Sequence, residues 1–335
     1  MSLHHSIQSR LYCPIPSAIN PLVDTIHQQT LQWACDFKLV VTDGKTYPRL
    51  SAAKFAWLVA RGYPEVNLHN LQIVSDWITC VFIHDDLCDG SRVGKTPQGL
   101  RPMHHQFLLA LDGEHGHALD DPLSYALRDI YQRLREKTSD GWRRRFRDHM
   151  AAYFQANRWE AQNRLLDRIP SLDTYLHWRQ YTSCVEPCFD LILMSDQLSS
   201  EAAYLSHESV RSLARMANNY IAWVNDIFSL DRERQEGNMN NLVVVLQNEY
   251  QLSLQAALEL AIEMCNSEME AFLNLASHLP SWGEQEDDQL NRYIRGFRSW
   301  MRGNLDWYMD TGRYHVEDER SEIDTSDMDM LALAS

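Results

Sequence analysis

Apolar residues recur every three to four positions along most of the chain. Between Pro21 and Val41 they fall at Leu22, Ile26, Leu31, Trp33 and Phe37. This spacing is close to the period of an α-helix. Amphipathic runs of the same kind cover 51–60, 67–89, 120–137, 142–166, 171–196, 202–234, 253–278 and 285–309. The pattern therefore predicts a largely helical protein.

Turn-forming residues separate these runs, and they include Gly44, Gly62, Pro64, Gly94, Pro97, Asp112, Gly113 and Pro280. No run alternates apolar and polar residues over a long stretch, as a half-buried strand would. We therefore expect a single all-α domain of about ten helices over residues 1–314. Within 171–196, Pro187 has no N–H to donate to the Ser183 carbonyl, so this helix should be interrupted.

The net charge of the chain argues against one class of partner, nucleic acid. The 335 residues include 31 Lys and Arg against 46 Asp and Glu, a net charge of -15. A nucleic-acid binder would need a basic face, so nucleic acid is not expected as a partner. There are only 13 glycines and no G-x-G-x-x-G or P-loop pattern, which argues against a dinucleotide-binding fold. Residues 315–335 form an acidic segment that we expect to be a disordered tail.

No stretch approaches 18 unbroken apolar residues, and the amino terminus lacks the apolar core of a signal peptide. The seven cysteines are odd in number and include no C-x-x-C pair. We therefore expect a reduced, cytoplasmic protein with no membrane partner.

Three carboxylates gather in the sequence His84-Asp85-Asp86-Leu87-Cys88-Asp89, directly after an apolar run. Asp85 and Asp89 are four residues apart and share one helix face. Such carboxylates repel one another and oppose the dipole at the end of a helix. Binding a hard divalent cation such as Mg²⁺ would offset this cost. An acidic helix end that faces water is the alternative.

A second set of oxygen ligands lies within the run 202–234. Asn225, Ser229 and Glu233 are spaced at i, i+4 and i+8, so an amide, a hydroxyl and a carboxylate follow one stripe of a helix. Together they form a plausible hard-metal site of low net charge. Because apolar residues surround the stripe, a plain surface helix is a weaker explanation.

With these two motifs the sequence resembles the bacterial class I terpene synthases, over about residues 12–314. The family's aspartate-rich motif matches Asp85, Asp86 and Asp89, and its N-D-x-x-S-x-x-x-E motif matches Asn225, Asp226, Ser229 and Glu233. Further matches are the sensor Arg179, the basic Arg232, the closing W-x-x-x-x-x-R-Y pattern of Trp307, Arg313 and Tyr314, and the opening segment Tyr12 to Pro16.

The resemblance implies a helical bundle around a central active-site cavity, in which three Mg²⁺ ions, replaceable by Mn²⁺, join both motifs to a prenyl pyrophosphate. It assigns Asp85 as the main ligand of the first motif, with Asp86 and Asp89 beside it. Asn225, Ser229 and Glu233 would hold a further ion. Arg179, Arg232, Arg313 and Tyr314 would bind pyrophosphate oxygens, a role that suits arginine's fixed charge and fork of donors.

The resemblance also implies a switch beside the sensor. We hypothesise that pyrophosphate bound to Arg179 moves Thr182 and turns the Ser183 carbonyl toward the substrate. The alternative is a simple proline kink at Pro187. Aromatic faces would stabilise the resulting carbocation. The residues expected to form such a pocket are Phe55, Phe82, Phe189 and Trp307.

The implied activity is cyclisation of a linear prenyl pyrophosphate, with farnesyl pyrophosphate favoured and geranylgeranyl pyrophosphate as the alternative. A chain-elongating prenyltransferase would instead carry a second aspartate-rich motif in place of Asn225 to Glu233. A helical scaffold or binding protein would not need the metal-spaced stripes. His104, His105, His115 and His117 could form another metal site, but we expect exposed imidazoles in a loop-rich region. The protein is expected to be a monomer or a homodimer.

Overall fold

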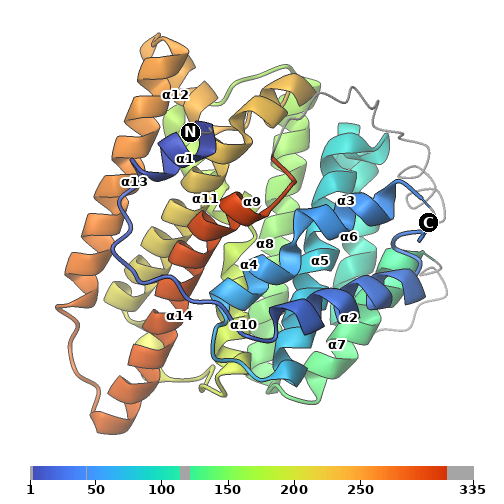
Figure 1. Cartoon of the computed structure of the whole chain (residues 1–335), viewed down its shortest axis with the longest axis vertical. Coiled ribbons are helices and arrows are strands. Elements are labelled where there is room, and N and C mark those ends of the chain that lie inside the picture. The colour runs from blue at the N-terminus through green and yellow to red at the C-terminus, as the bar shows by residue number, and fades with distance from the viewer. Residues whose placement is uncertain (1–2, 43, 114–120, 315–335) are drawn as a thin grey trace. The chain divides into compact units, whose positions relative to one another are not determined.

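The structure is a computed structural model that describes residues 3–42, 44–113 and 121–314. Fourteen α-helices and two short 3-10 helices lie in these ranges, which contain no β-strand (Figure 1). The predicted all-α fold is therefore confirmed.

The helices, in chain order, are α1 (Leu3–Gln8), α2 (Val23–Asp36), α3 (Thr46–Ala53), α4 (Phe55–Gly62), α5 (Leu68–Gly90), η1 (Val93–Lys95), α6 (Pro97–Leu111), α7 (Pro122–Arg135), α8 (Asp140–Leu165), α9 (Leu172–Thr182), α10 (Val185–Ser195), η2 (Ala203–Ser206), α11 (Glu208–Glu236), α12 (Leu242–Tyr250), α13 (Leu254–Ala276) and α14 (Glu284–Asp310).

The chain forms two compact units. The first comprises Met1–Asn20, Arg61–Val66 and Asp167–Asp310. At its centre α11 packs against α9, α10, α12, α13 and α14. Fully buried side chains fill this core, among them Phe189, Leu213, Val224, Phe272 and Phe297.

The second unit comprises the described residues of Pro21–Ala60 and Asn67–Leu166, together with residues 311–314. Its long helix α5 packs against α2, α7 and α8, and α6 packs against α7 and α8. The core is again apolar and includes Ile26, Val74, Leu127, Ile130 and Phe154. The predicted division into a domain over 1–314 and an acidic tail stays a prediction, because 315–335 lie outside the described residues.

Two predicted helices are each split in two. The run 51–60 divides between α3 and α4, because Lys54 adopts a left-handed conformation with φ of 50°. The run 171–196 divides between α9 and α10 at Ser183 and Cys184, where the φ of Cys184 is 54°. Pro187 lies in the first turn of α10, where a missing N–H breaks no bond within that helix.

Helices α6 and α12 fall outside the predicted runs. In α6, Pro97 occupies the first turn and the Thr96 side chain accepts a hydrogen bond from the Gly99 N–H, so residues that suggest a turn instead begin a helix. The expectation of exposed, loop-bound histidines was therefore wrong for His104, which lies in α6 with 1% of its surface exposed. His105 is exposed as expected but also belongs to α6, whereas His115 and His117 lie outside the described residues.

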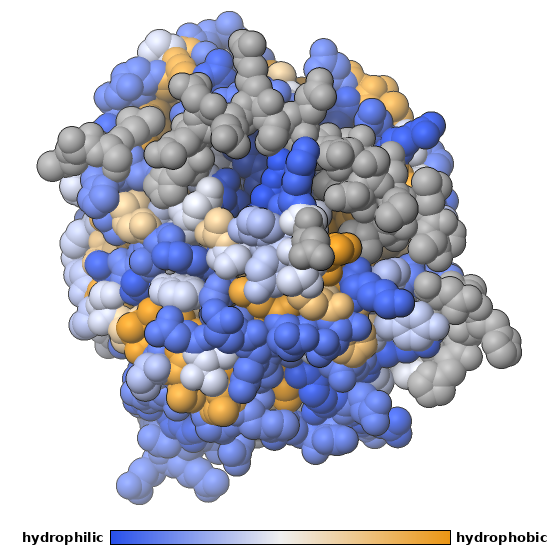
Figure 2. Space-filling model, turned by 45° about the vertical axis from the view of Figure 1, so that its right-hand side comes forward, coloured by the Kyte–Doolittle hydropathy of each residue, from blue (hydrophilic) through white to orange (hydrophobic). Residues whose placement is uncertain are grey.

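Along the described ranges, no helix combines the length and the apolar character that crossing a membrane demands. The face drawn in Figure 2 is covered mostly by hydrophilic residues, with hydrophobic residues in smaller groups among them.

Candidate active site

The aspartate-rich motif occupies the last two turns of α5. Asp85 and Asp86 are partly exposed, and Asp89 is exposed. The carboxylate of Asp86 pairs with both terminal nitrogens of Arg313, with Nη1–Oδ2 at 3.0 Å and Nη2–Oδ1 at 2.6 Å. This two-pronged pair fixes the carboxylate and the guanidinium in one plane.

Two hydrogen bonds attach the segment that carries Arg313 to the end of α3. Thr311 Oγ1 donates to the Ala53 carbonyl and the Gly312 N–H donates to the Ala52 carbonyl, both at 2.8 Å. These two bonds fix the backbone next to Arg313, independently of the pair between Arg313 and Asp86.

Aromatic rings surround the Arg313 guanidinium. Phe55 and Phe82 stack with their centroids 4.1 Å apart, and the guanidinium carbon lies 5.7 and 5.1 Å from their centroids. It lies 5.9 Å from the ring of Tyr314. Burial opposes the charge of Arg313, but Asp86, Tyr314 and Asp85 together outweigh this effect, and the pKa of the guanidinium is raised. The structure thus brings together five residues that the sequence singles out in three separate segments.

Arg164, at the end of α8, pairs with Asp89. Its Nη1 lies 2.9 Å from Asp89 Oδ1, and its Nη2 donates to the Cys88 carbonyl at 3.1 Å. One side chain thus neutralises the third aspartate and caps the carboxyl end of α5. Sequence reasoning missed Arg164, and no motif in the chain marks it.

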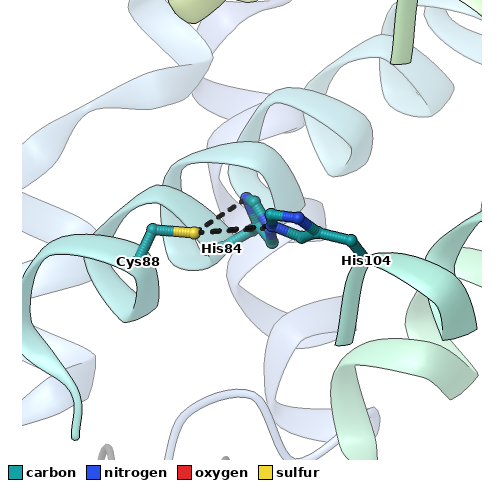
Figure 3. A group of neighbouring side chains, drawn as sticks. All are labelled: His84, Cys88 and His104. Atoms are coloured by element: carbon teal, nitrogen blue, oxygen red, sulfur yellow. Dashed lines mark hydrogen bonds between the residues drawn. The ribbon is translucent and has the colours of Figure 1, made fainter. Parts of the chain in front are cut away.

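Behind the aspartates lies a buried polar cluster of His84, Cys88 and His104 (Figure 3). Cys88 Sγ is 3.5 Å from His84 Nε2 and 3.9 Å from His104 Nε2. Burial lowers the pKa of His84 to about 3 and that of His104 to about 2, so both rings are neutral.

These three side chains could be taken for a metal site. However, Arg158 Nη1 lies 3.1 Å from His104 Nδ1. Arginine only donates, so Nδ1 accepts and the ring proton sits on Nε2, which then offers Cys88 a proton and no lone pair. The cluster is better explained as a hydrogen-bonded part of the core, and His84 as a packed neighbour of the motif.

The second ligand set lies in the carboxyl-terminal half of α11, with Glu233 in the last turn. Asn225 and Glu233 are partly buried and Ser229 is buried, on successive turns of the helix. Ser229 Oγ donates to the Asn225 carbonyl at 2.7 Å, and Glu233 Oε2 accepts from Asn241 Nδ2 at 3.0 Å. Burial and the neighbouring charge of Asp226 raise the pKa of Glu233 to about 7.

Asp226, next to this stripe, is 1% exposed and is surrounded by donors. Its Oδ1 accepts from Arg179, with Nε at 3.0 Å and Nη2 at 2.8 Å. Its Oδ2 accepts from the Tyr175 hydroxyl and, at 2.9 Å, from the Leu242 N–H. Burial raises the pKa of Asp226, and Arg179 opposes that rise. The motif alignment included Asp226 but gave it no role, and Tyr175 was missed.

Arg179 also contacts a predicted metal ligand. Its Nη2 donates to Asn225 Oδ1 at 3.0 Å, and its Nη1 donates to Thr182 Oγ1 at 3.2 Å. On the other side of the amide, Asn225 Nδ2 donates to the Tyr308 hydroxyl oxygen at 2.9 Å. The predicted sensor, linker and ligand thus form one hydrogen-bonded network.

The remaining predicted residues lie elsewhere in the first unit. Arg232 pairs with Glu236 at 2.8 Å, one turn along α11. Ser183 Oγ donates to Asn218 Oδ1 at 2.7 Å, just beyond α9. Phe189 packs on Phe297 with centroids 4.5 Å apart. Trp307, on α14, is 1% exposed.

The chemistry of the side chains suits a hard divalent cation and a polyanion. Each unit offers carboxylate, amide or hydroxyl oxygens, the ligands that Mg²⁺ and Mn²⁺ prefer. Each also holds an arginine beside those oxygens, Arg313 in one and Arg179 in the other. Guanidinium groups of this kind bind phosphate oxygens in pairs.

A family model described as "Terpene synthase family 2, C-terminal metal binding" matches residues 76–271, which include both oxygen-rich motifs. The chain belongs to the terpene synthase family. The terpene synthase match makes it an enzyme of the cyclase type, a carbon–oxygen lyase with a domain that binds divalent metal.

Two curated relatives span nearly the whole terpene synthase chain. The (+)-T-muurolol synthase ((2E,6E)-farnesyl diphosphate cyclizing) of Roseiflexus castenholzii is 36% identical over 316 residues, covering 94% of this chain and 96% of the relative. The germacrene A synthase of Nostoc punctiforme is 35% identical, covering 91% and 94%.

Among solved structures, germacradien-4-ol synthase from Streptomyces citricolor superposes with a TM-score of 0.79 at 23% identity, covering 90% of this chain and 98% of that one. An α-eudesmol synthase gives a TM-score of 0.81 at 21% identity, covering 90% and 99%. These two structures show that the fold is that of the class I terpene synthases.

Proposed function

We propose that this terpene synthase ionises and cyclises farnesyl pyrophosphate to a cyclic sesquiterpene, with three Mg²⁺ ions, in the cytoplasm. The observation that carries the proposal is the network around Arg179. A side chain suited to binding phosphate donates directly to an oxygen ligand, Asn225 Oδ1. The farnesyl diphosphate (pyrophosphate) specificity in the name of the R. castenholzii relative supports the chain length.

The proposed ligands divide into two sets. Asp85, with Asp86 and Asp89 beside it, contributes carboxylate oxygens from α5. Asn225, Ser229 and Glu233 contribute three kinds of oxygen from α11. Bound Mg²⁺ would neutralise the charge that builds on the leaving pyrophosphate.

The arginines would hold the pyrophosphate and steady it as the carbon–oxygen bond breaks. Arg179 would exchange its bonds to Asp226 and Asn225 for phosphate oxygens. Arg313, with Tyr314, would reach a phosphate oxygen from its place beside Asp86, and Arg232 would turn from Glu236. Preorganised donors of this kind stabilise developing negative charge.

The break between α9 and α10 supports the proposed switch. Thr182 is 8% exposed and already bonded to Arg179. Pro187 cannot donate to the Ser183 carbonyl, which therefore lacks the bond of a continuous helix. We propose that movement of Arg179 onto pyrophosphate pulls Thr182 and turns that carbonyl to the substrate.

Aromatic faces would then stabilise the carbocation and exclude water. Phe55 and Phe82 are the strongest candidates, since their stacked rings already lie against a cation, Arg313. Phe189 and Trp307, which are almost completely buried, stay predictions.

The test is incubation of the pure protein with geranyl, farnesyl and geranylgeranyl pyrophosphate, each with Mg²⁺ and with EDTA. Pyrophosphate release and gas chromatography–mass spectrometry report the reaction. A cyclic C15 product from farnesyl pyrophosphate that forms only with Mg²⁺ is the expected result. A C20 product would change the substrate, a longer linear pyrophosphate formed in a parallel incubation with added isopentenyl pyrophosphate would indicate a prenyltransferase, and no turnover of any substrate would contradict the proposal.

A further inference from the structure

The amide of Asn225 is bonded on both sides. Its Nδ2 donates to the Tyr308 hydroxyl oxygen at 2.9 Å, and its Oδ1 accepts from Arg179 Nη2 at 3.0 Å. All three residues belong to the same compact unit.

These partners determine which way the amide faces. Arginine has donors and no acceptor, so the amide oxygen must face Arg179. The amide nitrogen then faces Tyr308, and the hydroxyl oxygen of Tyr308 accepts a hydrogen bond from it. A flipped amide would set its NH₂ group against the guanidinium and leave the oxygen facing Tyr308. Orientation matters because Oδ1 can bind a metal ion and a protonated amide nitrogen cannot.

Tyr308 is itself rigidly placed. It is 1% exposed, and its ring stacks on Phe228 with centroids 4.3 Å apart and an angle of 4° between the planes. Phe228 lies three residues after Asn225 on α11, so it is a neighbour on the same helix face. Helix α11 therefore carries Asn225 and, through Phe228, also positions the Tyr308 ring whose hydroxyl contacts Asn225.

In the proposed reaction Arg179 leaves Asn225 to bind pyrophosphate, and one of the two restraints on the amide is lost at the moment Oδ1 is needed. We propose that Tyr308 is a positioning residue of the metal site, which holds Asn225 with Oδ1 turned to the metal through its bond to Nδ2. This inference rests on the proposed function.

The variant Tyr308→Phe tests it, because it keeps the ring and the stack on Phe228 and removes the hydroxyl. Tyr63→Phe is the matched control. Tyr63 lies in the same unit, is 3% exposed, and donates its hydroxyl proton to the Cys188 carbonyl at 2.7 Å, away from Asn225. Mn²⁺ binding is measured by electron paramagnetic resonance with inorganic pyrophosphate present. Thermal melting and the Mg²⁺ dependence of turnover are measured alongside.

Tyr308→Phe should weaken Mn²⁺ binding about three- to ten-fold, the effect of one hydrogen bond. Excess Mg²⁺ should restore its kcat to within about two-fold of the wild type, since the chemistry is untouched. Tyr63→Phe should lower the melting temperature without changing metal affinity. Unchanged Mn²⁺ binding in Tyr308→Phe, or an equal loss in both variants, would overturn the inference. A wild-type protein that binds no Mn²⁺ with pyrophosphate would instead overturn the proposed function.

Discussion

The two oxygen-rich motifs solve the same electrostatic problem in different ways. At the end of α5 the carboxylates are partly exposed, and Asp86 and Asp89 each pair with an arginine from a distant segment. In the carboxyl-terminal half of α11 the ligands are mostly neutral groups, and one buried carboxylate, Asp226, is compensated by two arginine nitrogens, a tyrosine and a backbone N–H.

The difference follows from the cost of burying charge. An ion pair whose groups are accessible to water contributes little to the free energy of unfolding, so little stability is lost when it is broken. A buried charge that loses its partner remains desolvated and uncompensated. Loss of Asp226 should therefore lower stability more than loss of Asp86, whereas changes to the neutral ligands of α11 and to the α5 carboxylates should affect mainly chemistry.

Breaking the two pairs gives the largest contrast. Asp226→Ala leaves Arg179 buried without its partner, and we expect a loss of about 3–5 kcal/mol in the free energy of unfolding. Asp86→Ala should cost less, about 1–2 kcal/mol, because 33% of the Asp86 side chain is exposed to water, although the Arg313 side chain that it pairs with is buried to the same degree as Arg179. Urea denaturation at pH 7 measures both. Asp226→Asn, which keeps an acceptor, should fall between them, and equal losses for the two alanine variants would refute the contrast.

Replacing the two arginines at the end of α5 with lysine distinguishes binding of pyrophosphate from pairing with the aspartates. Arg313→Lys removes the fork that is proposed to hold pyrophosphate and should lower kcat/KM about ten- to a hundred-fold. Arg164→Lys keeps a charge near Asp89 and should lower it by less than about five-fold. Steady-state kinetics with farnesyl pyrophosphate checks both. Matching losses would mean that Arg313 acts only as a counterion of the motif.

Lowering the pH should reduce the stability that comes from the buried cluster of His84, Cys88 and His104. The folded-state pKa of His104, about 2, lies below the ordinary value of 6.5, so the unfolded chain binds the proton more readily. The stabilisation from keeping this ring neutral is complete above pH 6.5 and is lost as the pH falls toward 2. Below pH 6 it should decrease by about 1.4 kcal/mol per pH unit.

His104→Gln removes that titration and keeps an acceptor for Arg158. Its cost in unfolding free energy relative to the wild type should therefore shrink as the pH is lowered from 7 to 5. Urea denaturation at the two pH values gives the difference, and a cost that stays constant would show that folding does not lower the pKa of His104.

The smallest effect on stability is expected at the helix break. Pro187→Ala lies in the first turn of α10 and should change the unfolding free energy by less than about 1 kcal/mol. It supplies an N–H to the Ser183 carbonyl, however, and should slow pyrophosphate release about five-fold. Stopped-flow detection of pyrophosphate follows that step. Unchanged release would leave the break as a simple proline kink.

The sequence predicts the helices and the two motifs because both follow a regular period. In long runs such as α5 and α11 the spacing of apolar residues fits an α-helix and not a strand. Ligands spaced four residues apart on such a helix must share a face. Helix α6 was missed because Pro97, Gly99 and Pro102 suggest a turn, although Thr96 caps a helix there. Helix α12 was missed because Leu242 to Leu246 is a short apolar run without periodicity.

The partners of the motifs were harder to foresee. Arg164, Tyr175 and Tyr308 reach Asp89, Asp226 and Asn225 from other helices, and no local pattern records such a meeting. Arg313 was found only through a family resemblance. Side-chain pairing across elements depends on packing and on the balance of buried charge, which a linear period does not contain.

The most direct test of the account is a single-turnover reaction with farnesyl pyrophosphate and Mg²⁺, quenched at intervals and analysed for pyrophosphate and volatile product. The wild type is compared with Asp85→Ala and Ser229→Ala, one change in each ligand set. We predict a cyclic sesquiterpene from the wild type, and pyrophosphate release slowed by about a hundred-fold or more in each variant with little change in melting temperature. Release at the wild-type rate in either variant would contradict the claim that both motifs serve the ionisation step.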